Sequence, residues 1–229
     1  MKEWHEAREV ADKERVSPFR VLQMAARFRH VDRFYLPTYF DSRLRMYYMP
    51  DTLNPQGSDY QKALLHFANG NPVTSQNIEA VQRDLLITMA NAASMKTPLG
   101  KTDKLDLNGR VSWALGMVER LEDEATDPVA NQKFWTECDE PFQFLAALRE
   151  YYEIFVWQTS TVARVPNGRD ASNSGSQIIG GIVRDPKTCF YCNVTMTYQD
   201  KVAHSPQDLY GVVAEEAQIY LKSDPWLHK

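Results

Sequence analysis

The sequence of 229 residues predicts a mostly helical α+β protein. Apolar residues recur at helical spacing through most of the chain, capping residues and prolines precede several of these stretches, and β-branched or aromatic runs are few and short. With 43% apolar and 24% charged residues, the chain can form one large or two small packed domains. It has no apolar run of about 18 residues, and its start is charged where a signal peptide would be apolar. We therefore expect neither membrane contact nor secretion.

Helices are expected where a capping residue or a proline precedes an apolar stripe. Ser17 and Pro18, for example, precede the periodic residues Val21, Ala25 and Phe28, which places a helix at 18–31. The same signals predict further helices at 59–69, 75–93, 107–121, 128–136, 140–157 and 176–184. Ser205 to Asp208 form a capping box that opens a last helix, whose apolar stripe runs from Leu209 to Tyr220.

Short strands are expected at 34–36, 46–49, 159–165 and 189–198, where aromatic or β-branched residues gather. The first two enclose a polar loop at 41–45, whose arginines would point outward. The third strand runs into the turn residues 166–168, and Asp170 follows at its end. A stretch rich in Ser, Asn and Gly then leads to the helix at 176–184.

The positive charge of the chain is local. Its net charge is −4, so general adhesion to nucleic acid is not predicted. Residues 15–45, however, hold seven arginines and no lysine against two aspartates. Because guanidinium groups form bidentate contacts with phosphates, this segment is a candidate for phosphate binding. The alternative is a solvated helix face with ion pairs.

Most standard catalytic signatures are absent from the sequence. It has no Walker-type or dinucleotide-binding glycine loop, and no histidine pair at zinc-binding helical spacing. Three cysteines are too few for a disulfide framework or a four-ligand zinc site, and we expect Cys189 and Cys192 to be buried, inert thiols in a strand. The five histidines are scattered, and none sits beside a serine or cysteine in a recognisable nucleophile setting.

Asp170 has the surroundings that a metal-binding carboxylate requires. A strand would hold it rigidly, small residues follow it, and hydroxyl and amide groups are nearby. A single aspartate in a polar turn is more often a helix cap. The residues around Asp170 alone leave both interpretations open.

Several blocks of the sequence resemble, in order and spacing, the single-subunit, phage-type DNA-directed RNA polymerases. The blocks are Asp41 to Tyr47, Leu53 to Gly57, Phe134 to Phe142, Arg169 to Gln177 and Asp208 to Ala214. The similarity extends from about residue 15 to residue 221. Its Asn-Pro-Gln-Gly block and its Asp-x-Ser-x-Ser-Gly block are specific for that family.

The resemblance implies part of a right-hand polymerase palm, with preceding helices linked to the thumb and palm. Asp170 corresponds to the first of two palm aspartates that hold two Mg²⁺ ions. The backbone carbonyl of Ala171, which stands where the family has glycine, would be a further ligand. Two such ions would clamp the attacking RNA 3′-hydroxyl and the leaving pyrophosphate during addition of a nucleoside triphosphate.

The resemblance also assigns basic residues to the nucleic acid and the nucleotide. Arg43 and Arg45 correspond to two arginines of a family loop near the DNA template and its hybrid with RNA, with Leu44 in place of a family glycine. Lys62 corresponds to a lysine beside the nucleic acid. Lys104, the second residue of an Asp-Lys pair, corresponds to a lysine near the incoming triphosphate.

The family's fingers helix and second palm aspartate are expected downstream of Lys229. Because one aspartate cannot hold two metal ions in working geometry, we expect this chain to be inactive alone and to need a second polymerase subunit with the fingers and the rest of the palm. The alternatives are a noncatalytic, polymerase-derived nucleic-acid-binding protein and a piece of a longer polymerase. We also expect no promoter-binding domain in this chain, so a promoter factor or a single-stranded-DNA-binding protein is a further candidate partner.

The resemblance divides the chain into three parts. Residues 1–50 would form a basic helix and a template-loop hairpin, and residues 51–157 a helical palm-associated region. Residues 158–229 would hold the palm strand with Asp170 and the helices that follow it. The resemblance further implies a location in the cytoplasm of an infected bacterial host.

Overall fold

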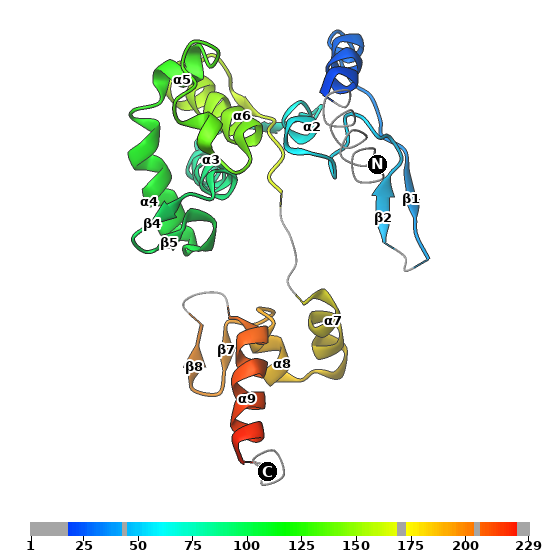
Figure 1. Cartoon of the computed structure of the whole chain (residues 1–229), viewed down its shortest axis with the longest axis vertical. Helices are drawn as coiled ribbons and strands as arrows, with labels where there is room; N and C mark the ends of the chain where they lie inside the picture. Colours follow the sequence, from blue (N-terminus) through cyan, green and yellow to red (C-terminus); the bar gives the residue numbers. More distant parts are fainter. Residues whose placement is uncertain (1–17, 43–44, 169–172, 204–206, 224–229) are drawn as a thin grey trace, which may run out of the picture. The chain divides into compact units, whose positions relative to one another are not determined.

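The computed structural model describes residues 18–42, 45–168, 173–203 and 207–223 (Figure 1). Within these ranges the mostly helical α+β class is confirmed, because helices alternate with small two-stranded antiparallel sheets. The chain forms two compact units, residues 1–168 and 169–229. No helix in the same ranges is long and apolar enough to cross a membrane.

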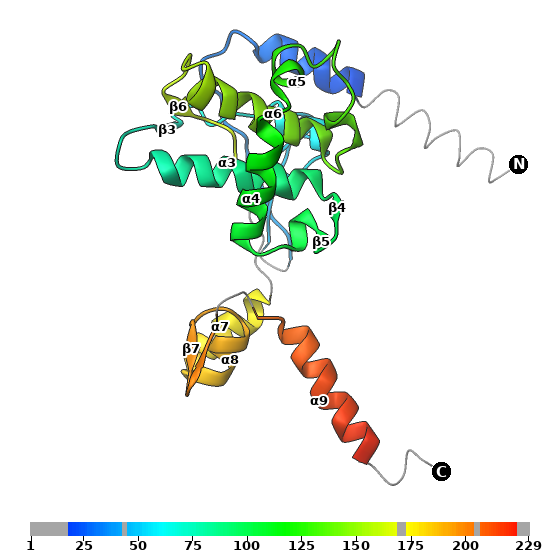
Figure 2. The same ribbon diagram turned by 90° about the vertical axis from the view of Figure 1, so that its left-hand side faces the viewer.

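The first unit has its main core among the helices α3 (Ile78–Ala93), α4 (Leu107–Val118) and α6 (Pro141–Tyr151), and α3 packs against both of the others (Figures 1 and 2). Apolar residues at helical spacing form the buried faces, among them Leu85 and Met89 on α3 and Phe144 and Leu148 on α6. Burial of each such side chain contributes about 1.5–3 kcal/mol. The helices predicted at 75–93, 107–121 and 140–157 are confirmed, with shifted ends.

Local hydrogen bonds define the start of α4 and the end of α6, and the sequence predicts the first of these. Asp106 is the N-cap of α4, and its carboxylate accepts a hydrogen bond from the backbone N–H of Gly109 at 2.9 Å. At its C-terminal end, α6 widens into the π-helical turn η3 (Tyr152–Val156). The Trp157 N–H closes that turn by donating to the carbonyl of Tyr152 at 2.7 Å.

The helix predicted at 128–136 is wrong. The chain instead forms α5 (Glu122–Thr126), a turn, and the 3₁₀ segment η2 (Trp135–Glu137). The buried carboxylate of Glu124 accepts hydrogen bonds from the backbone N–H groups of Phe134 and Trp135, both at 3.0 Å. A side chain thus takes the N–H groups that a helix would have used.

A smaller core joins the helix at 18–28 to Leu53 and Leu65. Beside it, β1 (Thr38–Phe40) pairs with β2 (Met46–Tyr48) in an antiparallel hairpin with Tyr39 opposite Tyr47. The strand predicted at 46–49 is confirmed, but the one at 34–36 is wrong. Phe34 packs on Phe28 instead, with ring centroids 4.8 Å apart.

The segment from 59 to 72 connects this smaller core to the rest of the unit. Only α2 (Asp59–Ala63) is helical, so the helix predicted at 59–69 is too long. It is followed by β3 (Asn71–Pro72), which pairs antiparallel with β6 (Val162–Ala163). Gly70 has φ +62°, and a Cβ there would lie 2.4 Å from a methyl group of Val162, so this junction requires glycine.

A hairpin and a 3₁₀ turn follow α3. They are β4 (Lys96–Thr97), β5 (Gly100–Lys101) and η1 (Thr102–Lys104). The fully buried hydroxyl of Thr102 donates to the carbonyl of Ala90 at 2.7 Å and accepts from the N–H of Met95 at 3.0 Å. These bonds fix the turn against the end of α3.

The second unit consists of α7 (Ser174–Val183), α8 (Pro186–Tyr191), a hairpin of β7 (Thr197–Tyr198) and β8 (Lys201–Val202), and α9 (Leu209–Ser223). The strand predicted at 189–198 is wrong over most of its length. Asp185 caps α8 by accepting from the N–H groups of Lys187 and Thr188, both at 3.2 Å, and Pro186 takes the first helical position. The helix predicted at 176–184 is confirmed.

The last helix begins later than its predicted capping box. Asp208, not Ser205, precedes its first turn, and the Asp208 side chain accepts from the N–H of Tyr210 at 3.1 Å. Ser205 itself lies outside the described residues. An aspartate at this position serves the helix N-terminus as well as serine would.

Candidate nucleic-acid interface and catalytic strand

The hairpin of β1 and β2 presents the predicted arginine loop. The Arg45 N–H donates to the Asp41 carboxylate at 2.9 Å, and the Asp41 N–H donates to the carbonyl of Arg45 at 3.0 Å. Asp41 therefore closes the loop from both sides, and Arg45 is exposed. Arg43 and Leu44 lie outside the described residues.

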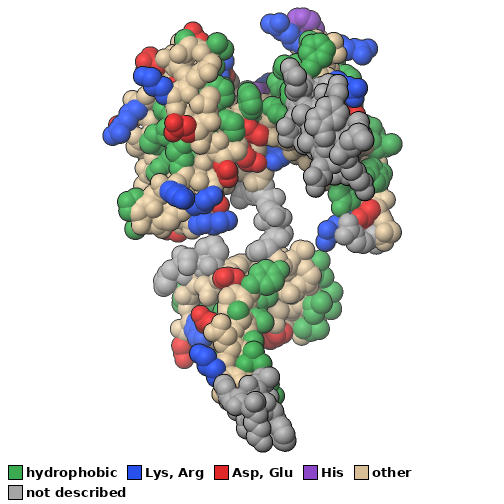
Figure 3. Space-filling model, viewed as in Figure 1, with side chains coloured by type: hydrophobic (Ala, Val, Ile, Leu, Met, Phe, Trp, Pro, Cys, Tyr) green, Lys and Arg blue, Asp and Glu red, His purple; other side chains and the backbone are tan. Residues whose placement is uncertain are grey.

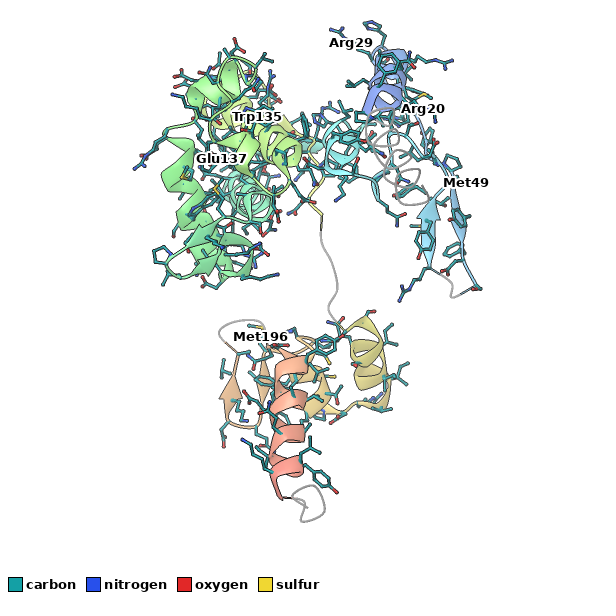
Figure 4. All side chains as sticks on the ribbon, viewed as in Figure 1. Arg20, Arg29, Met49, Trp135, Glu137 and Met196 are labelled. Carbon is teal, nitrogen blue, oxygen red and sulfur yellow. The ribbon has the colours of Figure 1, made fainter. Side chains whose placement is uncertain are left out.

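Exposed aromatic side chains lie on this hairpin, and arginines lie on or next to the helix that precedes it. Phe40 is 65% exposed and Met49 62% exposed, while Tyr39 and Tyr47 stack with ring centroids 5.7 Å apart. Figure 4 shows Arg20 on the neighbouring helix at 18–28, Arg29 directly after that helix, and Met49 beside β2. Aromatic faces that stack on bases, combined with guanidinium groups that bind phosphates, are the usual components of a single-strand or hybrid binding surface.

Lys62 lies on α2 and is held by another side chain. Its Nζ lies 3.2 Å from the Glu140 Oε1, and the two side chains are 32% and 44% exposed. Beside this pair, Asp59 accepts hydrogen bonds from the N–H groups of Phe142 at 2.7 Å and Gln143 at 2.9 Å. Asp59 and Lys62 thus dock α2 onto the N-terminus of α6, and nucleic-acid contact by Lys62 stays a prediction.

Lys104 stands at the end of the turn η1. Its side chain is 77% exposed, and its Nζ lies 3.0 Å from the Asp103 carboxylate. Partial burial acts to raise the pKa of Asp103, but hydrogen bonds from Lys104 and Ser94 outweigh it, so the pKa is lowered. Lys104 therefore extends into solvent from a fixed turn, as contact with a triphosphate would require.

The strand predicted at 159–165 is wrong over most of its length, because only β6 (Val162–Ala163) is a strand. The segment from β6 toward Asp170 is held by two sets of contacts. β3 pairs with β6 on one side. On the other, the buried carboxylate of Glu150 on α6 accepts hydrogen bonds from the N–H of Arg164 at 2.6 Å and the N–H of Val165 at 3.1 Å. Asp170 and Ala171 lie outside the described residues, so their predicted roles stay predictions.

The part of the chain that the structure describes contains no group of three or more His, Cys, Asp and Glu side chains that could hold a metal ion. The burial predicted for Cys189 and Cys192 is confirmed, although Cys189 lies in a helix, and burial raises the pKa of Cys192. Unreactive thiols are consistent with both observations.

Three acidic residues with structural roles were missed by sequence reasoning. Glu124, Glu150 and Asp59 each accept two backbone N–H groups from a segment that lies 10 or more residues away. Glu124 and Glu150 stand on the apolar faces of short helices, where a charged side chain needs a partner. That mismatch is the signal that could have found them, but it does not reveal the partner.

Residues 82–227 match the family model described as DNA-dependent RNA polymerase. The chain is 30% identical over 210 residues to the DNA-directed RNA polymerase of Enterobacteria phage T3, a match that covers 92% of this chain and 22% of the relative. It is 30% identical over 205 residues to the mitochondrial DNA-directed RNA polymerase of Mus musculus, covering 89% and 16%. The mitochondrial DNA-directed RNA polymerase 1 of Nicotiana sylvestris is also 30% identical over 205 residues, with 89% and 19% covered. The chain thus spans about a fifth of the length of these curated relatives.

Proposed function

Because this chain belongs to the DNA-dependent RNA polymerase family of the phage and mitochondrial type, we propose that it is a subunit of a DNA-directed RNA polymerase. The polymerase would add nucleoside triphosphates to the 3′ end of an RNA on a DNA template. The observation that carries the proposal is the family match over residues 82–227, which includes the Arg169 to Gln177 block with Asp170.

In this proposal the strand β6 and the second unit belong to the polymerase palm, and Asp170 is its first metal-binding aspartate. The Asp170 carboxylate and the Ala171 carbonyl are oxygen donors of the kind that Mg²⁺ requires. Two Mg²⁺ ions, when bound, supply activation of the 3′-hydroxyl and stabilisation of the leaving pyrophosphate. Since the described residues contribute no carboxylate cluster, the remaining ligands would come from outside them.

The arginine hairpin would hold the nucleic acid in the same assembly. Arg43 and Arg45 would contact the phosphates of the template or of the hybrid, and Lys104 the incoming triphosphate. The exposure of Arg45 and of Lys104 supports these roles. Contact between Lys62 and nucleic acid would require its ion pair with Glu140 to open, which costs little at a half-exposed pair.

A partner with the fingers and the rest of the palm would complete the enzyme. The outer face of α7 supports this, because four aliphatic side chains there are largely solvated (Figure 3). They are Ile178 and Ile179, both 62% exposed, Ile182 at 76% and Val183 at 63%. Large exposed apolar faces are typical of contact surfaces, and in this proposal the remaining palm covers the face of α7.

We propose further that the enzyme is a split polymerase of a bacteriophage, active in the cytoplasm of an infected bacterium. The phage T3 polymerase is one of the relatives on which this origin rests, and the mitochondrial relatives are equally similar. Promoter opening would then depend on a separate promoter factor or on a single-stranded-DNA-binding protein.

A noncatalytic nucleic-acid-binding protein derived from a polymerase is the second candidate. One observation favours it: the described residues form both strands of the arginine hairpin and the Asp41–Arg45 bonds that close its loop, which is what nucleic-acid binding alone requires. The two candidates differ in whether RNA synthesis depends on this chain.

Reconstitution tests the proposal. The chain would be co-expressed with the product of a neighbouring reading frame that encodes the fingers and second-aspartate motifs. RNA primer extension on a DNA template is then measured for each protein alone and for the pair. We expect extension by a one-to-one complex only. A complex that binds the primed hybrid without extending it would support the noncatalytic candidate and contradict the proposal.

A further inference from the structure

The side chain of Gln56 occupies the outer edge of β2 as a neighbouring strand would. Its Oε1 accepts a hydrogen bond from the N–H of Tyr48, and its Nε2 donates one to the carbonyl of Met46, both at 3.1 Å. The hairpin bonds of Arg45 and Met49 run to the opposite side, toward β1. Because backbone groups alternate between the two edges of a strand, Met46 and Tyr48 face away from β1. Gln56 therefore satisfies the edge that the hairpin leaves open.

The turn that carries Gln56 is itself fixed. The Asn54 side chain accepts from the N–H of Gln56 at 2.8 Å and donates to the carbonyl of Pro50 at 2.8 Å. At Gly57 a Cβ would lie 2.2 Å from the Oε1 of Gln61, a buried residue of α2. A side chain at Gly57 would therefore displace the side chain of Gln61 and approach the carbonyl of Asn54 at 3.0 Å. α2 is in turn bound to α6, because Asp59 of α2 accepts hydrogen bonds from two backbone N–H groups at the N-terminus of α6.

We infer that Gln56 is a positioning residue, which fixes the β1–β2 hairpin so that Arg45 meets the nucleic acid. This rests on the proposed function, in which that hairpin binds the hybrid. A two-stranded ribbon is marginally stable alone, so its orientation depends on what covers its free edge. Gln56 bonds the carbonyl of Met46, the residue next to Arg45, and so acts at the base of the arginine loop.

The test is a double-mutant cycle on binding by the full chain. The probe is a fluorescein-labelled RNA–DNA hybrid with a single-stranded template overhang. Arg45→Ala should lower affinity about fivefold at about 50 mM salt and reduce the magnitude of the salt slope by about one. Gln56→Ala should lower affinity by a similar factor, and should cause no further loss in the Arg45→Ala background. Hydrogen exchange of the Tyr48 amide should accelerate in Gln56→Ala.

Asn77→Ala is the matched control. The Asn77 side chain also accepts from one backbone N–H, that of Thr74 at 2.7 Å, and donates to one carbonyl, that of Pro72 at 2.9 Å, in the same unit. It should bind the hybrid within twofold of wild type. If Gln56→Ala does not fold, Gln56→Met replaces it, because it keeps the length and the neutral charge of the side chain and lacks both the acceptor for Tyr48 and the donor for Met46; its expected loss equals that of Gln56→Ala.

Three results would overturn the inference. The first is normal hybrid binding by Gln56→Ala despite faster exchange of the Tyr48 amide. The second is a loss of affinity in Gln56→Ala that adds to the loss in Arg45→Ala, and the third is an equal loss of affinity in Asn77→Ala. Normal binding by Arg45→Ala contradicts the hairpin assignment in the proposed function instead. If Arg45→Ala binds normally while Gln56→Ala binds more weakly, the inference is overturned as well, because Gln56 would then act on a residue other than Arg45.

Discussion

Buried carboxylates in the first unit bind backbone N–H groups. Glu124 holds the N–H groups of Phe134 and Trp135, and Glu150 holds those of Arg164 and Val165. A hydrogen bond to a charged group contributes about 1.5–3 kcal/mol, roughly twice a neutral one. Each carboxylate therefore fixes an irregular segment that neither a helix nor a sheet would satisfy.

Glu150→Ala should lower the free energy of unfolding by about 2–4 kcal/mol, because it leaves two backbone N–H groups without their acceptor. Urea unfolding followed by tryptophan fluorescence measures the change. Glu119→Ala, at an exposed residue at the end of α4, is the control and should stay within about 0.5 kcal/mol of wild type. A loss of the same small size in Glu150→Ala would contradict the assigned role.

Cys138 should be chemically inert in the native protein. Burial, followed by the negative charges of Glu124, Glu137 and Asp59, raises its pKa to about 12. We expect no alkylation by iodoacetamide at pH 8 without urea and full alkylation with it, measured by mass spectrometry. Rapid native alkylation at pH 8 would show that the thiol is not buried as described.

The same raised pKa gives a pH dependence. The folded state holds the Cys138 proton more tightly than the unfolded chain, whose thiol pKa is near 9.0. This contribution to stability is therefore complete below pH 9 and is lost as the pH rises toward 12. Stability should fall over that window, and Cys138→Ala should reduce the fall. An unchanged fall in that variant would assign it to other groups, such as Tyr152, whose pKa burial also raises to about 12.

At the scale of elements, α7 exposes four aliphatic side chains, and this face is the proposed contact surface for the polymerase partner. Ile182→Asp should leave folding intact, because Ile182 is 76% exposed. It should weaken assembly with the polymerase partner at least about tenfold, since a charge would be buried without a counterion. Size-exclusion chromatography with light scattering measures the complex. Val129→Asp, at a residue 77% exposed in the first unit, is the control. Equal assembly by both variants and wild type would contradict the predicted surface.

Sequence signals predict the helices whose apolar spacing and capping residues lie within the helix itself. α3, α4 and α6 were predicted because their apolar residues follow helical spacing and because a proline or an aspartate begins two of them. The segments at 128–136 and 189–198 were mispredicted for different reasons. In the first, a distant carboxylate takes the N–H groups. In the second, the aromatic residues Phe190 and Tyr191 masked the Asp-Pro start of α8.

The candidate site was predictable only in part. A polar stretch between aromatic segments predicts the outward loop with Arg45, and the exposure of Arg45 is confirmed. The pairing of Gln56 with β2 was not predictable, because it depends on how a turn folds back onto a strand edge. The role given to Asp170 came from the family resemblance, since the residues around it fit a helix cap equally well.

At the scale of the whole molecule, the family match spans both units while the chain covers about a fifth of its curated relatives. The described residues supply the arginine hairpin and a fixed strand, but no acidic cluster. In the proposed function, this chain supplies nucleic-acid contacts and one metal-binding aspartate, Asp170. The other ligands and the fingers are assigned to a partner.

The most direct test of this account is single-nucleotide extension of an RNA primer on a DNA template by the reconstituted polymerase carrying Asp170→Asn. If Asp170 holds the metal ions, its loss should slow extension at saturating Mg²⁺ by at least about three orders of magnitude, equivalent to about 4 kcal/mol of transition-state stabilisation. Asp185→Asn is the control, because Asp185 caps α8 and asparagine caps equally well. Extension by Asp170→Asn within tenfold of wild type would contradict the account.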